Sequence, residues 1–507
     1  MAVTDDMTAL ASRIGQEFNA VRGELTDRSG LGGIVDVQAA GAVGDGVVDD
    51  TAAIQAAIDA SATGDVVWFP GGTYLVSATI RLVPYRAYLG AGGRAQLSRI
   101  KAAPGLTGGA VLAARGWWDN ATLCDNPIRV EGLFIDGSSV PGAHGLVVYN
   151  FWSHVEDVQV GYIAGPAAGI LATDLGRDGV TITENSHSEN TFVRCRFLEH
   201  SGRATGFKVE THTNPARDPA PDGANQDGHI LDSFFAGISG DAIRMDRAAG
   251  WSIENNHLYG IGYNGIVLGN CYATKVQRNY VEDFGGADGE NNGAGPTYGY
   301  FNGIAMETVL DTRASIIADN TVSTSQPPDP AGNQWTCFYA RAGWGQNLAN
   351  LVIEGNTAVF AGNSAPASRR SWAFRLGEGE DPANGESPAR LLAVEWAGNQ
   401  IQAVDWWAGS RFVHDPTVQV SEHGVAVVRR RLTANWTTAA PAGAFRVRYE
   451  LLADGGQRTV TIPTTVRLST GLTTRSFPVP SGQVFVGLIE WSSLVSAYVL
   501  VAATVSG

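Results

Sequence analysis

Three acidic residues, Glu210, Asp246 and Glu307, occupy the same place in a repeated short pattern. Each directly follows a run in which two large apolar residues flank one other residue, which is the alternation of a β-strand. If these runs lie side by side in one sheet, neighbouring carboxylates are about 4.8 Å apart. Hydrolysis of a glycosidic bond uses two carboxyl groups roughly 5 Å or 6.5–9.5 Å apart. We therefore predict these acids as catalytic residues of polysaccharide cleavage, with Gly269 leaving space between Asp246 and Glu307.

Three further acids lie near this pattern and are reserve candidates for an acid or a base: Asp241, Glu282 and Asp283. The alternative for all six is a solvated position at the end of a strand, where acids spaced along a repeat avoid mutual repulsion. The sequence contains no Ser/His/Asp arrangement, P-loop, HExxH or CxxC motif. We expect neither a cofactor nor a metal.

The chain has 13 tryptophans, and several of them lie in or beside predicted loops. Aromatic ring faces stack on sugar rings and also anchor protein interfaces. Five tryptophans are therefore predicted to bind substrate: Trp117, Trp118, Trp152, Trp335 and Trp344. The alternative for these five is packing in the core or between subunits.

The elements that must position these side chains form a repeat that begins at Val130. Its first apolar column recurs along the chain at the following positions: Val130, Val155, Val193, Ile230, Ile253, Val276, Ile317, Ile353 and Trp396. A second column is Leu146, Ile170, Phe207, Ile243, Ile266, Ile304, Phe338 and Phe374. Units of this length cannot bury their own apolar faces and must stack. The repeat predicts coils with two recognisable strands each, joined by a turn and stacked into parallel sheets around an apolar interior.

A third column stands three residues after the first. It reads Leu133, Val158, Arg196, Ser233, Asn256, Asn279, Asn320, Asn356 and Asn399. Two residues further on the column is apolar again, with Leu198 in the coil that contains Val193. Because an amide side chain both donates and accepts hydrogen bonds, the five asparagines predict a ladder along the stacked turns. The alternative is that they bind a ligand.

Polar, Gly/Pro-rich insertions lengthen several coils at related places. Two follow the second predicted strand of consecutive coils, at residues 173–190 and 211–228. Three follow the first predicted strand of later consecutive coils, at residues 284–300, 323–336 and 360–371. Loops on a rigid scaffold commonly carry function, so these insertions predict the walls of a groove.

Two motifs precede the repeat. GDGVVDDTAAIQAAIDA at residues 44–60 predicts a glycine turn and a short helix, and VVWFPGGTYLVS at residues 66–77 predicts strands around a turn. The two motifs resemble the opening of the pectate-lyase-like, right-handed parallel β-helix superfamily, in the branch used by bacteriophage tail spikes and tail fibres. The resemblance implies a β-helix whose open end is capped by the helix near residues 50–60. It covers only this opening part of the chain and implies no catalytic residue.

The predicted fold is all-β, with three parts. Residues 1–33 contain an amphipathic helix and a glycine hinge, residues 34–414 form the parallel β-helix, and residues 415–507 form an antiparallel, sandwich-like β-domain. The resemblance implies that the N-terminal helix attaches the protein to the virion. The residues alone also allow a helix that packs on its own domain or pairs with copies of itself.

Composition limits the partners. The net charge of the 507 residues is −15, which argues against nucleic acid and anionic membranes. No apolar run is long enough for a transmembrane helix, and the N-terminus lacks the pattern of a signal peptide. Four widely spaced cysteines are expected to be free thiols: Cys124, Cys195, Cys271 and Cys337.

The resemblance and the residues together predict a phage tail-spike or tail-fibre protein, located in the virion tail and made without a signal peptide. Its expected partners are a host cell-surface glycan, other tail or baseplate proteins, and two further copies in a homotrimer. Two function classes remain open, a depolymerase that cleaves the glycan as a glycoside hydrolase or lyase, and an adhesin without catalysis. A secreted polysaccharide lyase or hydrolase is a third alternative.

Overall fold

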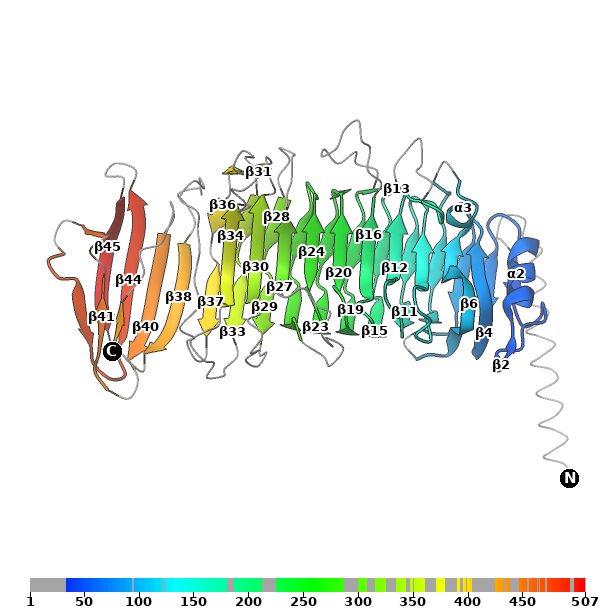
Figure 1. The fold of residues 1–507 in the computed structure, drawn as a ribbon, viewed down its shortest axis with the longest axis horizontal. Coiled ribbons are helices and arrows are strands. Elements are labelled where there is room, and N and C mark those ends of the chain that lie inside the picture. The colour runs from blue at the N-terminus through cyan, green and yellow to red at the C-terminus, as the bar shows by residue number, and fades with distance from the viewer. Residues whose placement is uncertain are drawn as a thin grey trace, which may run out of the picture.

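A computed structural model gives the fold as a long prism of stacked coils, with helix α2 (Thr51–Ala60) at one end and the C-terminus at the other (Figure 1). The described residues are 33–93, 95–121, 124–179, 187–211, 225–286, 300–307, 315–324, 334–342, 347–349, 351–360, 371–378, 390–392, 395–397, 399–403, 425–432, 435–437, 446–453, 456–462, 464, 466–469, 472–492 and 497–506. The predicted N-terminal helix and Trp344 lie outside these residues.

Three parallel ladders form the faces of the prism. The first ladder is β1 (Ile34–Asp36), β3 (Val66–Phe69), β5 (Ala87–Gly90), β7 (Arg129–Glu131), β10 (His154–Glu156), β14 (Thr191–Val193), β18 (His229–Leu231), β22 (Ser252–Glu254), β25 (Lys275–Gln277), β28 (Ser315–Ala318), β32 (Leu351–Glu354) and β36 (Glu395–Ala397). The second is β8 (Phe134–Asp136), β11 (Gln159–Gly161), β15 (Arg196–His200), β19 (Phe234–Ile238), β23 (His257–Ile261), β26 (Tyr280–Phe284), β29 (Thr321–Thr324), β33 (Thr357–Phe360) and β37 (Gln400–Ala403). The third is β9 (His144–Val148), β12 (Ala168–Thr173), β16 (Thr205–Glu210), β20 (Ile243–Asp246), β24 (Ile266–Gly269), β27 (Tyr300–Glu307), β30 (Gln334–Ala342) and β34 (Ser371–Glu378).

From β7 to β34 each coil thus contributes one strand to every ladder, which is the arrangement of a right-handed parallel β-helix. At the N-terminal end, the long strands β4 (Gly72–Leu82) and β6 (Ser98–Ala114) pair with each other, and β6 also pairs with both β8 and β9. Strand β2 (Asp45–Asp49) pairs with β4, and α2 packs at this end as predicted. The Asp50 carboxylate does not cap α2 but accepts hydrogen bonds from the backbone N–H groups of Val43 and Gly44, at 2.6 and 3.1 Å.

Short elements stand beside the three faces. They are α3 (Arg115–Trp118), β13 (His187–Ser188), β17 (Asn225–Gln226), β21 (Ala248–Ala249), β31 (Asn347–Ala349) and β35 (Arg390–Leu392). None of the described helices is long and apolar enough to cross a membrane.

Past β37 the pairing changes from parallel to antiparallel. Strands β38 (Val425–Leu432) and β40 (Arg446–Ala453) continue the second ladder in parallel, and β44 (Val484–Ser492) and β45 (Ala497–Ser506) then add as antiparallel neighbours. The remaining strands are β39 (Trp436–Thr437), β41 (Arg458–Thr461), β42 (Arg467–Leu468) and β43 (Ser476–Val479). The predicted domain boundary at residue 414 lies outside the described residues, so that division stays a prediction.

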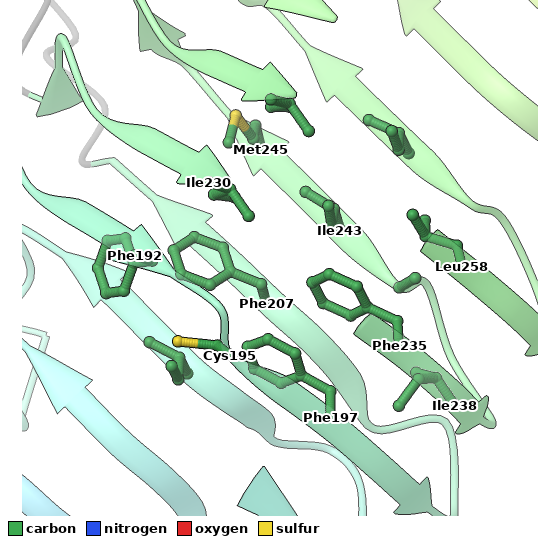
Figure 2. Packing of buried hydrophobic residues seen from close by; sticks show 14 of the residues in the cluster. Phe192, Cys195, Phe197, Phe207, Ile230, Phe235, Ile238, Ile243, Met245 and Leu258 are labelled. Atoms are coloured by element: carbon green, nitrogen blue, oxygen red, sulfur yellow. The ribbon is translucent and has the colours of Figure 1, made fainter. Parts of the chain in front are cut away.

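The core is a set of inward columns of large apolar residues, seen in the coils around Phe207 (Figure 2). The second predicted column is confirmed over its whole length by the strand register, from Leu146 to Phe374. The first column is confirmed except in one coil, where Phe192 and not Val193 pairs with Val155 and Ile230.

The error at Val193 carries through the rest of that coil. A shift by one residue turns every side chain of a strand to the opposite face. Cys195 therefore occupies the place predicted for Arg196, and Phe197 occupies the place predicted for Leu198. Burying Phe192, Cys195 and Phe197 keeps the Arg196 guanidinium outside, over the ring of Phe234.

The asparagine ladder is confirmed at the turns between the first and second ladders. In the first four asparagines, Nδ2 donates to the Oδ1 of the next asparagine at 2.9–3.0 Å. The same Oδ1 also accepts the backbone N–H of the earlier asparagine at 3.0 Å. Each Nδ2 also donates to a strand carbonyl one coil earlier, for example from Asn320 to Val276. All five side chains are buried, so the ladder satisfies polar groups that water cannot reach.

The residue before each ladder position lies in the left-handed region. Asp157, Arg194, Asp232, Asn255, Arg278 and Asp319 all have φ between 51° and 57° there, and glycines 132 and 355 take φ of 66° and 64°. This repeated conformation makes the sharp corner between the first and second ladders.

Candidate functional site

The predicted row of carboxylates lies on the third ladder in direct register. Glu210 of β16 pairs with Asp246 of β20, Asp246 with Gly269 of β24, and Gly269 with Glu307 of β27. The order and spacing predicted from the repeat are therefore confirmed. The catalytic role of the row stays a prediction.

Two members of the row are ion-paired within their own strands. The Lys208 ammonium lies 2.8 Å from Glu210 Oε1, and Arg244 Nε lies 3.0 Å from Asp246 Oδ2. The basic residue stands two places before the acid in both strands, so both side chains of each pair point outward. These two cations were not among the predicted site residues, although the spacing Lys-x-Glu and Arg-x-Asp was a signal for them.

Arg244 links the row to a second acid. Its Nη1 lies 3.3 Å from Asp241 Oδ2, and the Asp241 side chain is only 11% exposed. Burial of the guanidinium would lower the pKa of Arg244, but the charges of Asp246 and Asp241 outweigh this and raise the pKa above its ordinary value. Arg244 therefore stays cationic between the two carboxylates.

Gly269 opens the space beside Asp246. A Cβ placed on Gly269 would lie 3.0 Å from Asp246 Oδ1. The carboxylate thus leans over the neighbouring coil, toward the strand that carries Glu307. A larger residue at position 269 would meet this oxygen, so the glycine provides room at the centre of the row.

Asp241 belongs to a turn network and not to the outward row. Its Oδ1 accepts the backbone N–H of Asn264 at 3.1 Å and the Asn264 amide at 2.7 Å. Asn264 Oδ1 in turn accepts from the backbone and side chain of Asn302, at 2.7 and 3.2 Å. This second ladder was missed from the sequence, although each member stands two residues before an isoleucine of the second column.

Glu282 and Asp283 lie on a different face. Both belong to β26 of the second ladder, so they do not join the row on the third ladder. Glu282 accepts a hydrogen bond from Tyr280, which with burial raises the pKa of that phenol to about 12. Asp283 has a positive φ of 51°. Glu199, Gly237 and Gly260 of the neighbouring coils also have positive φ, so the backbone of the second ladder has the same local distortion in four successive strands.

The predicted tryptophans differ in exposure. Trp117 is buried in a small cluster with Val147 and Leu171, and Trp335 is buried with its Nε1 donating to Gly285 O at 3.3 Å. Neither presents a ring face to solvent, so we leave both out of the binding surface. Trp118 lies between Arg177 and Arg81, whose guanidinium carbons are 4.4 and 5.9 Å from its ring centroid. Trp152 is 60% exposed.

The predicted insertions connect strands of the third ladder to the rest of the coil. Those after β12 and β16 leave the C-terminal ends of third-ladder strands, and those after β26, β29 and β33 lead into the N-terminal ends of β27, β30 and β34. Most of their residues lie outside the described part of the chain. The prediction that they form the walls of a groove therefore stays a prediction. No group of three His, Cys, Asp or Glu suited to a metal occurs among the described residues.

Comparison with known proteins gives a family match in the N-terminal half. A family model described as rhamnogalacturonase A/epimerase, pectate lyase-like, matches residues 34–283. Over 48 residues the chain is 46% identical to a probable glucan endo-1,3-beta-glucosidase of Arthroderma benhamiae. That match covers 10% of this chain and 6% of the fungal protein, so the chain spans only a small part of that relative.

Solved structures extend the likeness over most of the chain. A tailspike protein mutant of E. coli bacteriophage HK620, in complex with pentasaccharide, aligns with a TM-score of 0.50 at 12% identity, covering 87% of this chain and 80% of that chain. The ORF18 protein of Geobacillus virus E2 aligns with a TM-score of 0.38 at 14% identity, covering 93% and 76%. At this identity the tailspike alignment shows a shared fold.

Proposed function

We propose, from the premise that residues 34–283 form a pectate lyase-like right-handed parallel β-helix, that the protein binds a polysaccharide across the third ladder and cleaves it. The observation that carries the proposal is the register of Glu210, Asp246 and Glu307 on adjacent and next-but-one strands. Strands one and two places apart are separated by roughly 4.8 and 9.6 Å. These separations match the two geometries of glycosidic hydrolysis.

Asp246 and Glu307 are the favoured pair. Gly269 keeps the strand between them free of a side chain, and a water molecule needs such room in the inverting reaction. In this scheme Asp246, the member of the pair next to Gly269, is the base that activates the water. Glu307 would then donate the proton to the leaving oxygen, and the anomeric configuration of the product would be inverted.

A non-catalytic adhesin is the second candidate. The ion pairs of Glu210 with Lys208 and of Asp246 with Arg244 favour it, because a paired carboxylate is less available as a base. In that case the row of alternating charges would hydrogen-bond sugar hydroxyls without breaking a bond.

We further propose that the protein serves as a bacteriophage tail spike or tail fibre, as a homotrimer in the virion. The motifs at residues 44–60 and 66–77 support this role through their resemblance to phage tail proteins. The fold shared with the HK620 tailspike agrees with it. The glycan would then be a host-surface polysaccharide, and the N-terminal segment would contact other tail proteins.

The test incubates the purified protein with surface polysaccharides from candidate hosts. It measures released reducing ends and the ultraviolet absorbance of unsaturated sugar products. Hydrolysis by the proposed pair predicts reducing ends without that absorbance, and their loss in Asp246→Asn and in Glu307→Gln. Glu131→Gln is the matched control, because Glu131 is an ion-paired carboxylate on the first ladder.

Three results would redirect the proposal. Product with the absorbance of an unsaturated sugar identifies a lyase and rejects hydrolysis by two carboxylates. Cleavage that persists in both variants moves the active site away from this row. Binding without product on each glycan that binds establishes the adhesin.

A further inference from the structure

The outer face of the second ladder carries a stack of rings that the proposed chemistry does not use. Arg196, Phe234, His257 and Tyr280 occupy one register position on β15, β19, β23 and β26. The Phe234 and His257 rings lie 5.3 Å apart edge-on, and the His257 and Tyr280 rings lie 5.0 Å apart and nearly parallel. Each ring is therefore held by its neighbours, and the last ring, Tyr280, remains 39% exposed.

A second exposed ring stands two residues along the neighbouring strand. Tyr259 of β23 is 46% exposed, and it has Ala236 on one side and Glu282 on the other in the register of the ladder. An exposed tyrosine presents both an apolar ring and a hydroxyl group to a partner. The small side chain of Ala236 leaves one side of Tyr259 open.

Two stacked glycines adjoin Tyr259, because Gly260 follows it in the chain and Gly237 follows its register neighbour Ala236. Gly237 and Gly260 take φ of 63° and 61°, at the same local distortion where Glu199 and Asp283 take 53° and 51°. A Cβ on Gly260 would have only the Gly237 backbone nitrogen within 4 Å, at 3.7 Å. A Cβ on Gly237 would lie 3.3 Å from Glu199 Oε1, so the Glu199 carboxylate lies beside Gly237 and the open position is Gly260.

Together these residues make a tyrosine platform, defined as Ala236, Gly237, Tyr259, Gly260 and Tyr280 with the carboxylates of Glu199, Glu282 and Asp283 at its margin. Aromatic faces pack against the C–H faces of sugar rings, and carboxylates accept hydrogen bonds from hydroxyl groups. Three carboxylates repel an acidic polymer. The platform therefore suits a partner that is rich in hydroxyl groups and carries no negative charge.

We infer that the tyrosine platform is a second glycan-binding surface, which takes a neutral saccharide segment and lies on a different ladder from the carboxylate row. The inference rests on the proposed function for the kind of ligand but not for cleavage. A glycan held on two faces would be bound without being cleaved at the platform. The protein would thereby stay bound to a polymer after the polymer dissociates from the carboxylate row.

The test is affinity electrophoresis of the full chain in gels that contain a neutral polymer, laminarin or dextran, or an acidic polymer, alginate. The background is Asp246→Asn with Glu307→Gln, so that cleavage does not interfere. Retardation is expected in at least one neutral gel and not in alginate. Tyr259→Ala and Tyr280→Ala should each weaken it roughly three- to tenfold, the usual contribution of one aromatic contact.

Two controls separate binding from folding. Tyr85→Ala removes an exposed tyrosine near the N-terminal end and should leave retardation unchanged. Tyr280→Phe keeps the ring but loses the hydrogen bond to Glu282, and it should retain most of the binding. Circular dichroism of each variant establishes that the β-helix is intact.

Several outcomes overturn the inference. They are unchanged retardation in both alanine variants, equal retardation in alginate, or no retardation by either neutral polymer. A change in oligomeric mass in Tyr280→Ala with unchanged glycan binding would assign the platform to contact between copies. The proposed cleavage fails by a different readout, the absence of reducing ends, so the two failures are distinguishable.

Discussion

Arg244 is the side chain whose removal would report most directly on the carboxylate row. It is paired with both Asp246 and the nearly buried Asp241. Replacing Arg244 with methionine leaves Asp241 without its cation. We expect a loss of about 2 kcal/mol in the free energy of unfolding, below the roughly 3–5 kcal/mol of a fully buried pair because Arg244 is 41% exposed.

The measurement is urea unfolding followed by tryptophan fluorescence. Arg129→Met is the matched control, because Arg129 and Glu131 form an exposed pair on the first ladder. That control should cost less than about 1 kcal/mol. Equal losses in both variants would mean that Asp241 is stabilised by Asn264 alone.

A buried histidine, His200, and a partly buried one, His144, make the stability depend on pH. Burial lowers the pKa of His144 and of His200 to about 4. His200 Nε2 is buried without a hydrogen-bond partner among the described residues. Because the unfolded chain binds protons near pH 6.5 and the folded chain does not, stability falls as the pH drops from about 6.5 to about 4.

Each histidine contributes a slope of up to about 1.4 kcal/mol per pH unit in that window. The double variant His144→Gln with His200→Gln should flatten the dependence of the urea midpoint between about pH 7.5 and about pH 5. His229→Gln, on the first ladder, serves as the control substitution. A slope that is the same in the wild type and the double variant would refute this assignment.

Single residues could be placed from the sequence where their position repeats from coil to coil. Glu210 and Asp246 share an offset from the second column, and that offset sufficed for their register. Their cations, Lys208 and Arg244, occupy one register position two residues before the acids, but this repeat was overlooked because only the apolar and acidic columns were followed. The burial of Trp117 depends on α3 folding over the third ladder, which the local sequence does not indicate.

At the scale of elements, the asparagine ladder is the feature that joins successive coils. Replacing Asn320 with alanine removes its bonds to Val276 O and Asn356 Oδ1. It also leaves the backbone N–H of Asn279 without its partner, and the Asn279 amide keeps only its bond to Ile253 O. Because each buried polar group without a partner costs roughly 1–3 kcal/mol, we expect a loss of about 3 kcal/mol or more.

Thermal unfolding by circular dichroism measures this loss. The control is Thr321→Ala, because Thr321 is the next residue in the chain and is partly exposed. The control should shift the midpoint only slightly. An Asn320→Ala midpoint close to that of Thr321→Ala would mean that water replaces the ladder amide.

Two strands in each coil could be predicted because their apolar columns recur. The structure has three, because the first predicted strand is divided between the first and second ladders at the asparagine turn. The one wrong register, at Val193, arose because the run Thr191 to Leu198 offers apolar residues in both frames. The two registers differ mainly in whether the charged Arg196 side chain is buried. The free-energy cost of burying it depends on the neighbouring coils, which the local sequence does not show. The continuation of the parallel ladder through β38 and β40 was not predicted, because their alternation is equally typical of an antiparallel strand.

At the scale of the whole molecule, the prism presents three long faces, with α2 at its N-terminal end (Figure 1). Our proposal of a homotrimer predicts a particle with three times the mass of one chain, which is 53.4 kDa. Size-exclusion chromatography with light scattering at micromolar concentration measures the mass directly. The mass of a single chain at all concentrations would rule out the trimer.

Two successive coils without insertions have the same length. Ile230, Ile253 and Val276 are evenly spaced along the chain and occupy adjacent strands of the first ladder. Duplicating or deleting one such unit would keep every inward column in phase, and it would change the length of the molecule by one strand spacing, about 4.8 Å. The length of the β-helix could therefore change in steps of one coil, while the sequences of its two ends stay the same.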